Sequence, residues 1–332
     1  MQTHESIVIG AGISGLLCAQ ALHDSGVDVL VIEKGRGVGG RMATRRFAGG
    51  RADHGAQLFT SRDLRFQMIV DEWLGEKVCK RWYVSKGCEL GAQGYVRYCG
   101  RTGMTDAPKW IARNLQVSKE TLVDHVHYDA SSRSWQITVQ GELAYACQTL
   151  FLTAPLPQSL TLLEAGDSPL EVSLHDELKG IRYHRGITII AQLDGPAQLS
   201  ETGAIRINDA PITWIGDNQA KGISPDVPLI TIHATPGFAD KHWESPDAER
   251  APLLIEAARP YLKSNVIDWQ CHRWGYSFPI NPWHDVFVED ADRSLFLAGD
   301  AFGGPRVEGA ALSGLMAAAE FLDKRSRRPL RS

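Results

Sequence analysis

The stretch that decides the fold is SIVIGAGISG, residues 6–15, which leads directly into LLCAQALH, residues 16–23. The first four residues form a short β-branched apolar run, which predicts a buried strand that ends at the glycines. Leu17, Cys18, Ala21 and Leu22 fall on one face of a helix, and Gly26 stops that helix. The run VDVLVIE, residues 27–33, predicts a second buried strand. The chain therefore begins with a strand–helix–strand unit.

Three glycines and one acid in this unit have the spacing of a dinucleotide-binding turn. Gly10 permits the tight turn, Gly12 lets the backbone approach a pyrophosphate, and Gly15 allows the helix to pack closely on the strand. A helix that begins near Ser14 directs N–H groups and the positive end of its dipole at that pyrophosphate. Glu33 closes the next strand, where its carboxylate can accept hydrogen bonds from the adenosine ribose. The alternative is a glycine-rich turn without a ligand.

The next segment, GVGGRMATR at residues 37–45, favours FAD over NAD. It places backbone N–H groups and the Arg41 guanidinium shortly after the ribose-binding acid. Such a loop suits the diphosphate and ribityl chain of the extended FAD molecule, and arginine makes charge-assisted hydrogen bonds to phosphate. The alternative is a basic surface loop.

A third glycine-rich segment lies near the C-terminus, in LAGDAFGG at 297–304 and VEGAALSG at 307–314. Asp300, at the end of a predicted strand, can accept a hydrogen bond from a ribityl hydroxyl. A helix that begins around Gly309 can direct its positive end at the flavin pyrimidine ring, where it would stabilise the charge of the reduced flavin. The three motifs together predict a flavoprotein.

Bulk properties exclude several other classes. The 332 residues predict two domains, and the net charge of −4 gives no general attraction to nucleic acid. None of the six cysteines forms a Cys-x-x-Cys pair, so we expect no metal site and reduced thiols in a cytoplasmic protein. The N-terminus does not have the pattern of a signal peptide, and no apolar run reaches the ~20 residues that span a bilayer.

The predicted fold class is α/β, with a Rossmann-type FAD-binding domain interleaved with a mainly antiparallel α+β substrate domain. Alternating runs such as 186–193 and 229–234 predict the antiparallel strands, and 247–262 predicts the clearest helix of that domain. The expected FAD-binding domain comprises residues 1–75, 105–160 and 285–332, and the expected substrate domain comprises residues 76–104 and 161–284.

With these motifs in place, the chain resembles the flavin amine oxidase superfamily, which shares the p-hydroxybenzoate-hydroxylase-like FAD fold. Within it, DHGAQLFT at 53–60, GDAF at 299–302, WIGDN at 214–218 and IHAT at 232–235 are similar to renalase and its bacterial relatives. The resemblance implies oxidation of 2- or 6-dihydro forms of NAD(P) to NAD(P)+. The flavin would take the hydride, and O2 would be the acceptor that yields H2O2.

The motifs and the resemblance together give the predicted site residues. The expected FAD contacts are Gly10, Gly12, Ser14, Gly15, Glu33, Lys34, Gly40, Arg41, Met42, Gln57, Leu58, Val126, Asp300, Val307 and Ala311. Because residues 299–314 contain no cysteine, the cofactor is expected to be non-covalent.

Three residues are candidates for the catalytic site. Asn218 and His233 match polar positions near the substrate pocket of the resembled family, and Trp274 is a candidate wall for a flat substrate. Each also has a structural alternative: a turn former for Asn218, a core histidine for His233 and a core aromatic for Trp274. His54 is expected to order the flavin loop. A dihydropyridine donor needs positioning more than acid–base chemistry.

Two other functions stay open at this point. One is a flavin amine oxidase or a desaturase that acts on an apolar substrate, which the aromatic-rich middle region permits. The other is a non-catalytic flavin-binding redox sensor.

Overall fold

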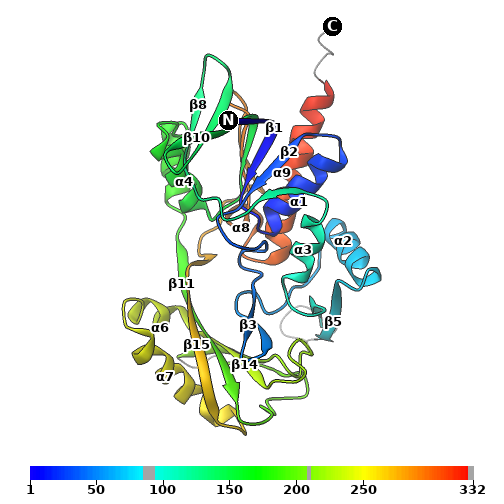
Figure 1. The fold of residues 1–332 in the computed structure, drawn as a ribbon, viewed down its shortest axis with the longest axis vertical. Coiled ribbons are helices and arrows are strands. Elements are labelled where there is room, and N and C mark those ends of the chain that lie inside the picture. Colours follow the sequence, from blue (N-terminus) through cyan, green and yellow to red (C-terminus); the bar gives the residue numbers. More distant parts are fainter. Residues whose placement is uncertain (85–93, 208–210, 328–332) are drawn as a thin grey trace. The chain divides into compact units, whose positions relative to one another are not determined.

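The computed structural model describes residues 1–84, 94–207 and 211–327 of the chain. These residues form two compact units (Figure 1), each built from segments that are distant in the sequence. The first unit comprises Met1–Gly40, Pro108–Arg182 and Pro279–Ser332. The second unit comprises Arg41–Ala107 and Tyr183–Phe278.

The first unit is built on a largely parallel sheet with the strand order β16-β17-β10-β1-β2-β7. Strands β17, β10, β1, β2 and β7 run parallel, whereas β16 is antiparallel to β17 and a β8–β9 hairpin extends from β10. The strands are β1 (Gln2–Ile9), β2 (Val29–Ile32), β7 (Gln116–Ser118), β8 (Val123–Asp129), β9 (Ser134–Val139), β10 (Glu142–Leu152), β16 (Val288–Asp290) and β17 (Leu295–Leu297). Every residue of β2 and β17 is buried, as expected for parallel strands covered on both faces.

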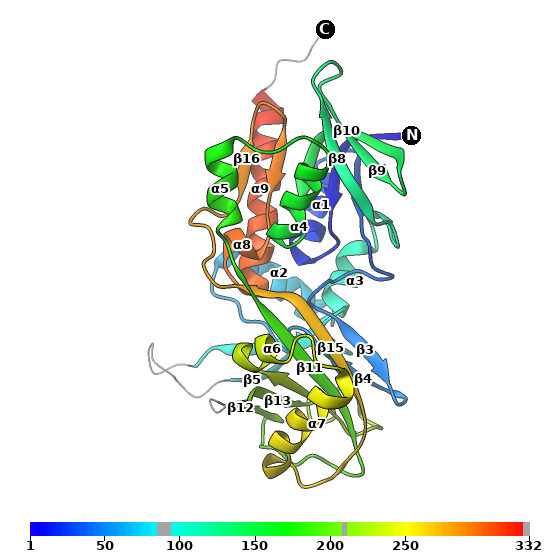
Figure 2. The ribbon, with the colours of Figure 1, turned by 90° about the vertical axis from the view of Figure 1, so that its left-hand side faces the viewer.

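Helices α1 and α9 of this unit lie side by side in both views (Figure 1 and Figure 2). Gly314 permits the close approach, since a Cβ at that position would collide with the backbone carbonyl of Ser14. The helices are α1 (Ile13–Asp24), α4 (Leu156–Ala165), α5 (Val172–Lys179), α8 (Asp300–Gly303) and α9 (Val307–Arg327); α3 (Asp106–Ala112) spans the boundary of the two units.

The second unit contains a five-stranded sheet with the order β12-β13-β14-β11-β15, in which β12, β13, β14 and β11 pair antiparallel. Helices α6 and α7 cover one face, where Ala239, Ala251 and Leu254 pack on Ile189 and Ile232. The sheet strands are β11 (Tyr183–Leu193), β12 (Ala204–Arg206), β13 (Ile212–Asp217), β14 (Leu229–Ala234) and β15 (Val266–Pro279). The other elements are the hairpins β3–β4 (Thr44–Phe47, Gly50–Asp53) and β5–β6 (Cys79–Val84, Val96–Gly100), α2 (Leu64–Gly75), α6 (Pro236–Lys241), α7 (Asp247–Ala258) and the 3₁₀ turn η1 (Arg259–Tyr261).

The architecture confirms the predicted fold class, a parallel Rossmann-like sheet combined with an antiparallel sheet. The division of the chain differs from the expected boundaries, because residues 161–182 group with the first unit and residues 41–75 with the second. Their hairpin is anchored there: Phe47 and Ala52 pack in one buried cluster with Ile190 and Leu229. The assignment of one unit to FAD and the other to the substrate stays a prediction.

Over the described ranges, no helix is both long and apolar enough to cross a membrane. Within the same residues, no group of three or more histidine, cysteine, aspartate or glutamate side chains is placed to hold a metal ion. The five described cysteines are free thiols: Cys18, Cys79, Cys99, Cys147 and Cys271.

Candidate functional site

The turn between β1 and α1 has the geometry that its glycines predict. Gly10 has a φ of 110°, and a Cβ at Gly15 would collide with the carbonyl oxygen of Gly10. A Cβ at Gly12, in contrast, would meet nothing within 4 Å. Gly12 is also the N-cap of α1, and no side chain caps the helix there. The second glycine therefore faces open space at a helix N-terminus, which is the arrangement that admits a pyrophosphate.

Glu33 lies just after β2 and is held by two backbone amides. Its Oε2 accepts a hydrogen bond from Ala11 N at 2.8 Å, and its Oε1 accepts one from Gly35 N at 2.7 Å. These bonds fix the carboxylate beside the glycine turn, and each oxygen retains a second lone pair for a ribose hydroxyl. The neighbouring Lys34 is exposed, and its ammonium donates to Gln158 Oε1 at 3.2 Å.

Ser14, in the first turn of α1, is 4 % exposed, and its hydroxyl has no hydrogen-bond partner among the described residues. A buried hydroxyl without a partner is costly, so this atom is suited to a ligand phosphate at the same helix end. The orphaned hydroxyl and the open space at Gly12 are the two observations by which the first unit fits a dinucleotide.

The C-terminal motif lies on two consecutive helices of the first unit. Gly299 has a φ of 137° and donates its N–H to Ser313 Oγ at 2.8 Å. Asp300 is the buried first residue of α8, and Ala311 is fully buried in α9, which begins at Val307. Val126 is also fully buried, in β8. The sequence predicts Asp300 at the end of a strand, but β17 ends at Leu297 and Asp300 begins helix α8 instead. The contact of these residues with FAD stays a prediction.

Arg41 and its neighbours belong to the second unit. The Arg41 Nη1 donates to the carbonyl oxygens of Tyr276 and Ser277, each at 3.3 Å. The Arg41 carbonyl accepts from Ala56 N at 2.8 Å. Met42, which follows, is 3 % exposed. Arg41 therefore links its loop to β15, and the predicted bond to a phosphate is not tested by these contacts.

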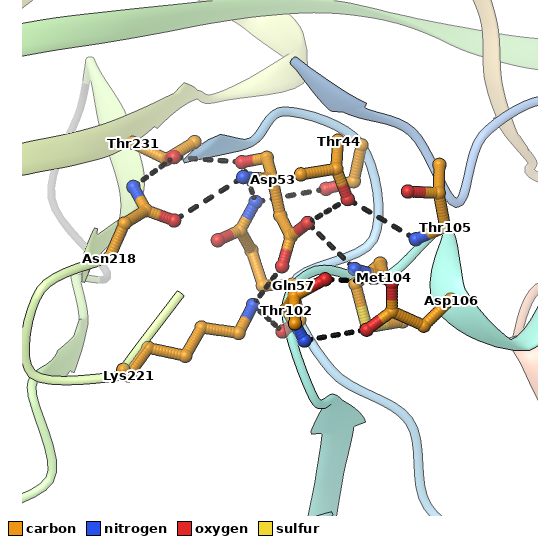
Figure 3. Close-up of polar contacts among 12 residues, drawn as sticks. Thr44, Asp53, Gln57, Thr102, Met104, Thr105, Asp106, Asn218, Lys221 and Thr231 are labelled. Atoms are coloured by element: carbon orange, nitrogen blue, oxygen red, sulfur yellow. Dashed lines mark hydrogen bonds and ion pairs between the residues drawn. The ribbon is translucent and has the colours of Figure 1, made fainter. Parts of the chain in front are cut away.

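Asp53, at the end of β4, is the centre of a buried polar network (Figure 3). Its Oδ2 lies 2.5 Å from the ammonium of Lys221, and the two side chains are 0 % and 1 % exposed. Its Oδ1 accepts from Thr44 Oγ1 at 2.5 Å and from Met104 N at 2.8 Å. Lys221 also donates to the carbonyl oxygen of Gln57. The Asp53–Lys221 ion pair and its hydrogen bonds therefore join four segments of the chain, at residues 44, 53–57, 104 and 221.

Asn218 holds the backbone of Asp53 from the other side (Figure 3). Its Oδ1 accepts from Asp53 N at 3.3 Å, and its Nδ2 donates to Thr231 Oγ1 at 3.0 Å. Thr231 Oγ1 in turn donates to Asp53 O at 2.7 Å. Asn218 is 1 % exposed, and these bonds engage both ends of its amide. Its predicted contact with a substrate is not among them.

His233 on β14 meets Gln57, so the structure brings together two of the predicted site residues. The Gln57 Nε2 lies 3.3 Å from His233 Nε2 and donates to Asp53 O at 2.7 Å. Burial, followed by the charge of Lys221, lowers the pKa of His233 from 6.5 to about 4. The ring is therefore neutral at neutral pH. Because the Gln57 amide nitrogen can only donate, His233 Nε2 accepts and the ring proton lies on Nδ1.

Trp274 packs in a cluster with two histidines. Its ring centroid lies 5.3 Å from that of His54 and 4.3 Å from that of His272, and its Nε1 donates to His54 O at 3.0 Å. Burial lowers the pKa of His54 to about 3, with further contributions from the charges of His272 and Arg45. His54 is therefore neutral and unsuited to act as a base near neutral pH, and the ordering role predicted for it stays a prediction.

The buried histidines give the protein a predictable acid sensitivity. The unfolded chain takes up a proton on His233 below pH 6.5, whereas the folded chain does not until about pH 4. Stability is therefore lost as the pH falls through this window. At about pH 5, the proton that His233 takes up only in the unfolded chain lowers the free energy of unfolding by on the order of 2 kcal/mol. Urea unfolding of His233→Gln should show a smaller loss between neutral pH and pH 5 than the wild type. His23→Gln, at an exposed histidine, serves as the control. If His233→Gln lost as much free energy of unfolding between neutral pH and pH 5 as the wild type, His233 would not be the cause of the acid sensitivity.

The sequence did not single out Lys221, and it gave Asp53 no role of its own. Both lie in or beside segments that carry the resemblance, since Asp53 begins DHGAQLFT and Lys221 follows Asn218 by three residues. Their positions in or beside these segments were the only sign in the sequence that Asp53 and Lys221 belong to the site. The ion pair itself joins positions 168 residues apart.

A family model described as flavin containing amine oxidoreductase matches residues 66–322, and one described as an NAD(P)-binding Rossmann-like domain matches residues 8–73. The first match covers more than half of the chain. The chain belongs to the flavin-containing amine oxidoreductase family. Membership implies FAD as the cofactor and an oxidoreductase as the class of protein, so the hypothesis of a non-catalytic sensor loses its support.

Relatives with curated descriptions match only part of the chain. The 2-oxo-Delta(3)-4,5,5-trimethylcyclopentenylacetyl-CoA monooxygenase of Pseudomonas putida is 25% identical over 183 residues, which cover 55% of this chain and 28% of that protein. Polyamine oxidase 1 of Oryza sativa subsp. japonica is 51% identical over 53 residues, which cover 15% of this chain and 10% of that protein. The matches thus span less than a third of each relative's length.

Solved structures resemble the chain along nearly its whole length. Putrescine oxidase bound to putrescine has a TM-score of 0.72 at 15% identity, covering 97% of this chain and 99% of that one. A fatty acid isomerase from P. acnes that produces CLA has a TM-score of 0.69 at 13% identity, covering 96% and 98%. At these identities the likeness shows the fold alone.

Proposed function

We propose that the protein is an oxidase with non-covalently bound FAD, and that its substrate is a dihydronicotinamide nucleotide. Molecular oxygen is the proposed electron acceptor. The observation that carries this proposal is the lack of negative charge on the candidate substrate residues Asn218, His233 and Trp274, of which His233 is held neutral by burial. The resemblance of residues 53–60, 214–218 and 232–235 to renalase supports the same substrate.

The buried carboxylates of the second unit are already engaged, as far as the described residues extend. Asp53 is neutralised by Lys221. Asp217 accepts hydrogen bonds from Gln219 N at 2.8 Å and Ala220 N at 3.1 Å. An amine substrate enters as a cation and needs a carboxylate or an aromatic cage to replace its water. Asp53 could meet that need only by giving up its ion pair with Lys221, and the Oδ1 of Asp217 is held by two backbone amides.

The groups near Trp274 suit a flat, electron-rich donor. His54 and His233 are held neutral by burial, and the guanidinium of Arg45 acts on His54 and His272. A dihydropyridine becomes an aromatic pyridinium when it gives up a hydride, so no base is required. The residues then have to orient the ring and exclude water, which is the role we assign to His233, Gln57 and Trp274.

The cofactor-binding residues are proposed from the first unit and the loop that follows it. Gly12 and Ser14 would hold the pyrophosphate, Glu33 the adenosine ribose and Asp300 the ribityl chain. When bound, FAD would supply the acceptor for the donor's hydride, which carries two electrons. Because residues 299–314 contain no cysteine, this segment offers no thiol for a covalent link.

A second candidate is oxidation of an amine or desaturation of an apolar substrate, and the comparisons favour it over the first. The family model is that of amine oxidoreductases, and polyamine oxidase 1 and putrescine oxidase are similar to the chain. The hydroxyneurosporene desaturase of Rubrivivax gelatinosus is 39% identical over 62 residues, which cover 19% of this chain and 12% of that protein.

One anaerobic experiment separates the two candidates. The purified yellow protein is mixed with 2- and 6-dihydro-NAD(P), with ordinary NADPH and with a panel of amines that includes putrescine. We expect the isomeric dihydronicotinamides to bleach the visible flavin absorbance at least a hundredfold faster than any amine. Rapid bleaching by an amine would move the protein to the second candidate. Bleaching by neither class would refute the dihydronicotinamide and the amine substrates and leave desaturation of an apolar substrate as the remaining candidate.

A further inference from the structure

A surface hollow of about 560 Å³ lies in the second unit, at the edge of its sheet formed by β15. Strand β3, strand β15 and the first residue of α7 supply its walls. The lining residues are Arg45, Arg46, Asp247, Trp269, Gln270 and Cys271. None of them is a predicted FAD contact or a predicted catalytic residue.

The hollow carries an uncompensated positive charge. Among the described lining residues the one carboxylate, Asp247, is 51 % exposed and forms an ion pair with Arg250, whose Nε donates to it at 2.9 Å. Neither Arg45 nor Arg46 forms an ion pair with a carboxylate of the described ranges. Arg45 Nη1 makes a long contact of 3.4 Å with Gln270 Oε1. Two arginines therefore line the hollow and have no carboxylate partner within the described ranges.

The strand pairing adds a second argument for an absent anion. In the β3–β4 hairpin, Arg46 stands directly opposite Arg51. Like charges in opposite positions of an antiparallel pair repel one another, and the pair is stabilised if an anion binds between or beside them. A planar guanidinium fork binds carboxylate or phosphate oxygens in a bidentate manner, and a phosphate group offers enough oxygens for two arginines.

We propose that this hollow is a subsite for the phosphate groups of a nucleotide, bound by Arg45 and Arg46. The inference rests on the proposed function and deepens it by locating the phosphates of a dinucleotide substrate. Arg45 connects the two regions, because it lies close enough to His54 and His272 for its charge to act on both rings. Those rings pack on Trp274. The phosphate subsite thus adjoins the residues proposed to orient the dihydropyridine.

Calorimetric titration of the FAD-loaded protein tests the subsite without turnover. The ligands are ADP, inorganic pyrophosphate and adenosine, and the loaded protein is used so that ADP does not enter the cofactor site. ADP is expected to bind at least tenfold more tightly than adenosine, and Arg45→Gln/Arg46→Gln is expected to weaken ADP about tenfold or more. The control Arg81→Gln/Arg259→Gln removes the same charge from two exposed arginines elsewhere in the unit and should leave ADP binding unchanged.

Three outcomes would overturn the subsite. They are a wild type that does not bind ADP at all, a wild type that binds adenosine as tightly as ADP, and a control variant that loses as much ADP affinity as Arg45→Gln/Arg46→Gln. Pyrophosphate that binds as tightly as ADP would place recognition in the phosphates alone, and weaker pyrophosphate would add a contribution from the nucleoside. Either result keeps the subsite.

A measurement of KM in the same variant separates this inference from the proposed function. In Arg45→Gln/Arg46→Gln the KM for a dihydronicotinamide dinucleotide should rise about tenfold or more, whereas that for the dihydronicotinamide riboside should not change. If no dihydropyridine reduces the flavin, the proposed function fails, and the ADP titration still decides whether the subsite exists.

Discussion

Replacing Lys221 by methionine is expected to lower the free energy of unfolding by about 3–5 kcal/mol, because it leaves a buried carboxylate without its cation. The partner, Asp53, is 0 % exposed and lies 2.5 Å from the ammonium. Asp53 cannot turn toward water, since Thr44 and Met104 donate to its other oxygen (Figure 3). Methionine keeps most of the side-chain volume, so the loss reports the charge rather than a cavity.

Urea unfolding of the FAD-free and FAD-loaded proteins measures this loss. Lys179→Met is the matched control, since Lys179 pairs with Glu164 at 3.2 Å on an exposed surface, with 65% and 43% of the two side chains exposed. A surface pair contributes about 0–1 kcal/mol. The double variant Asp53→Asn/Lys221→Met should recover part of the loss, because it removes both charges. A loss below about 1 kcal/mol in Lys221→Met would show that the pair does not hold this region together.

The Lys221 variant should also change the predicted substrate region. Lys221 donates to Gln57 O, and Gln57 contacts His233, whose pKa the charge of Lys221 helps to lower. Removing the cation therefore raises the pKa of His233 toward its ordinary value and weakens the position of Gln57. Stability and the protonation of His233 are coupled through one ammonium group.

The sequence could predict those parts of the site that depend on neighbouring residues. The Gly10, Gly12 and Gly15 spacing requires a turn with a left-handed glycine and a helix packed on its strand, and the structure has both. Glu33 lies at the end of the next strand for the same reason. In each case a local pattern determines a local geometry, so the prediction needed no knowledge of distant contacts.

The remaining parts depend on contacts between distant segments, which periodicity does not report. Asn218 has the pattern of a turn residue or a substrate contact, and in the structure its amide clamps the backbone of Asp53. Residues 41–75 follow the dinucleotide unit in sequence, but their hairpin packs on β14 and groups with the second unit. Arg45 and Gln270 meet across 225 positions. A single sequence offers no spacing rule for such pairs.

Replacing Gly12 by alanine is expected to reduce FAD occupancy at least tenfold and to leave the fold of the FAD-free protein intact. A Cβ at Gly12 meets no protein atom within 4 Å, and the φ of −76° suits alanine. The new methyl group would instead occupy space that a pyrophosphate needs for close approach to the backbone. We expect the free energy of unfolding of the FAD-free variant to stay within about 0.5 kcal/mol of the wild type.

Gly15→Ala should behave differently, and the comparison tests the assignment of the two glycines. Its Cβ would collide with the Gly10 carbonyl, so both FAD occupancy and the stability of the FAD-free protein should fall, the latter by about 1–3 kcal/mol. Gly75→Ala, at a helix end with open space around it, is the control for a neutral substitution. Occupancy is read from the ratio of flavin to protein absorbance after gel filtration, and stability from urea unfolding. Full FAD occupancy in Gly12→Ala would mean that the pyrophosphate does not bind at this turn, because the only space the methyl group fills lies outside the protein.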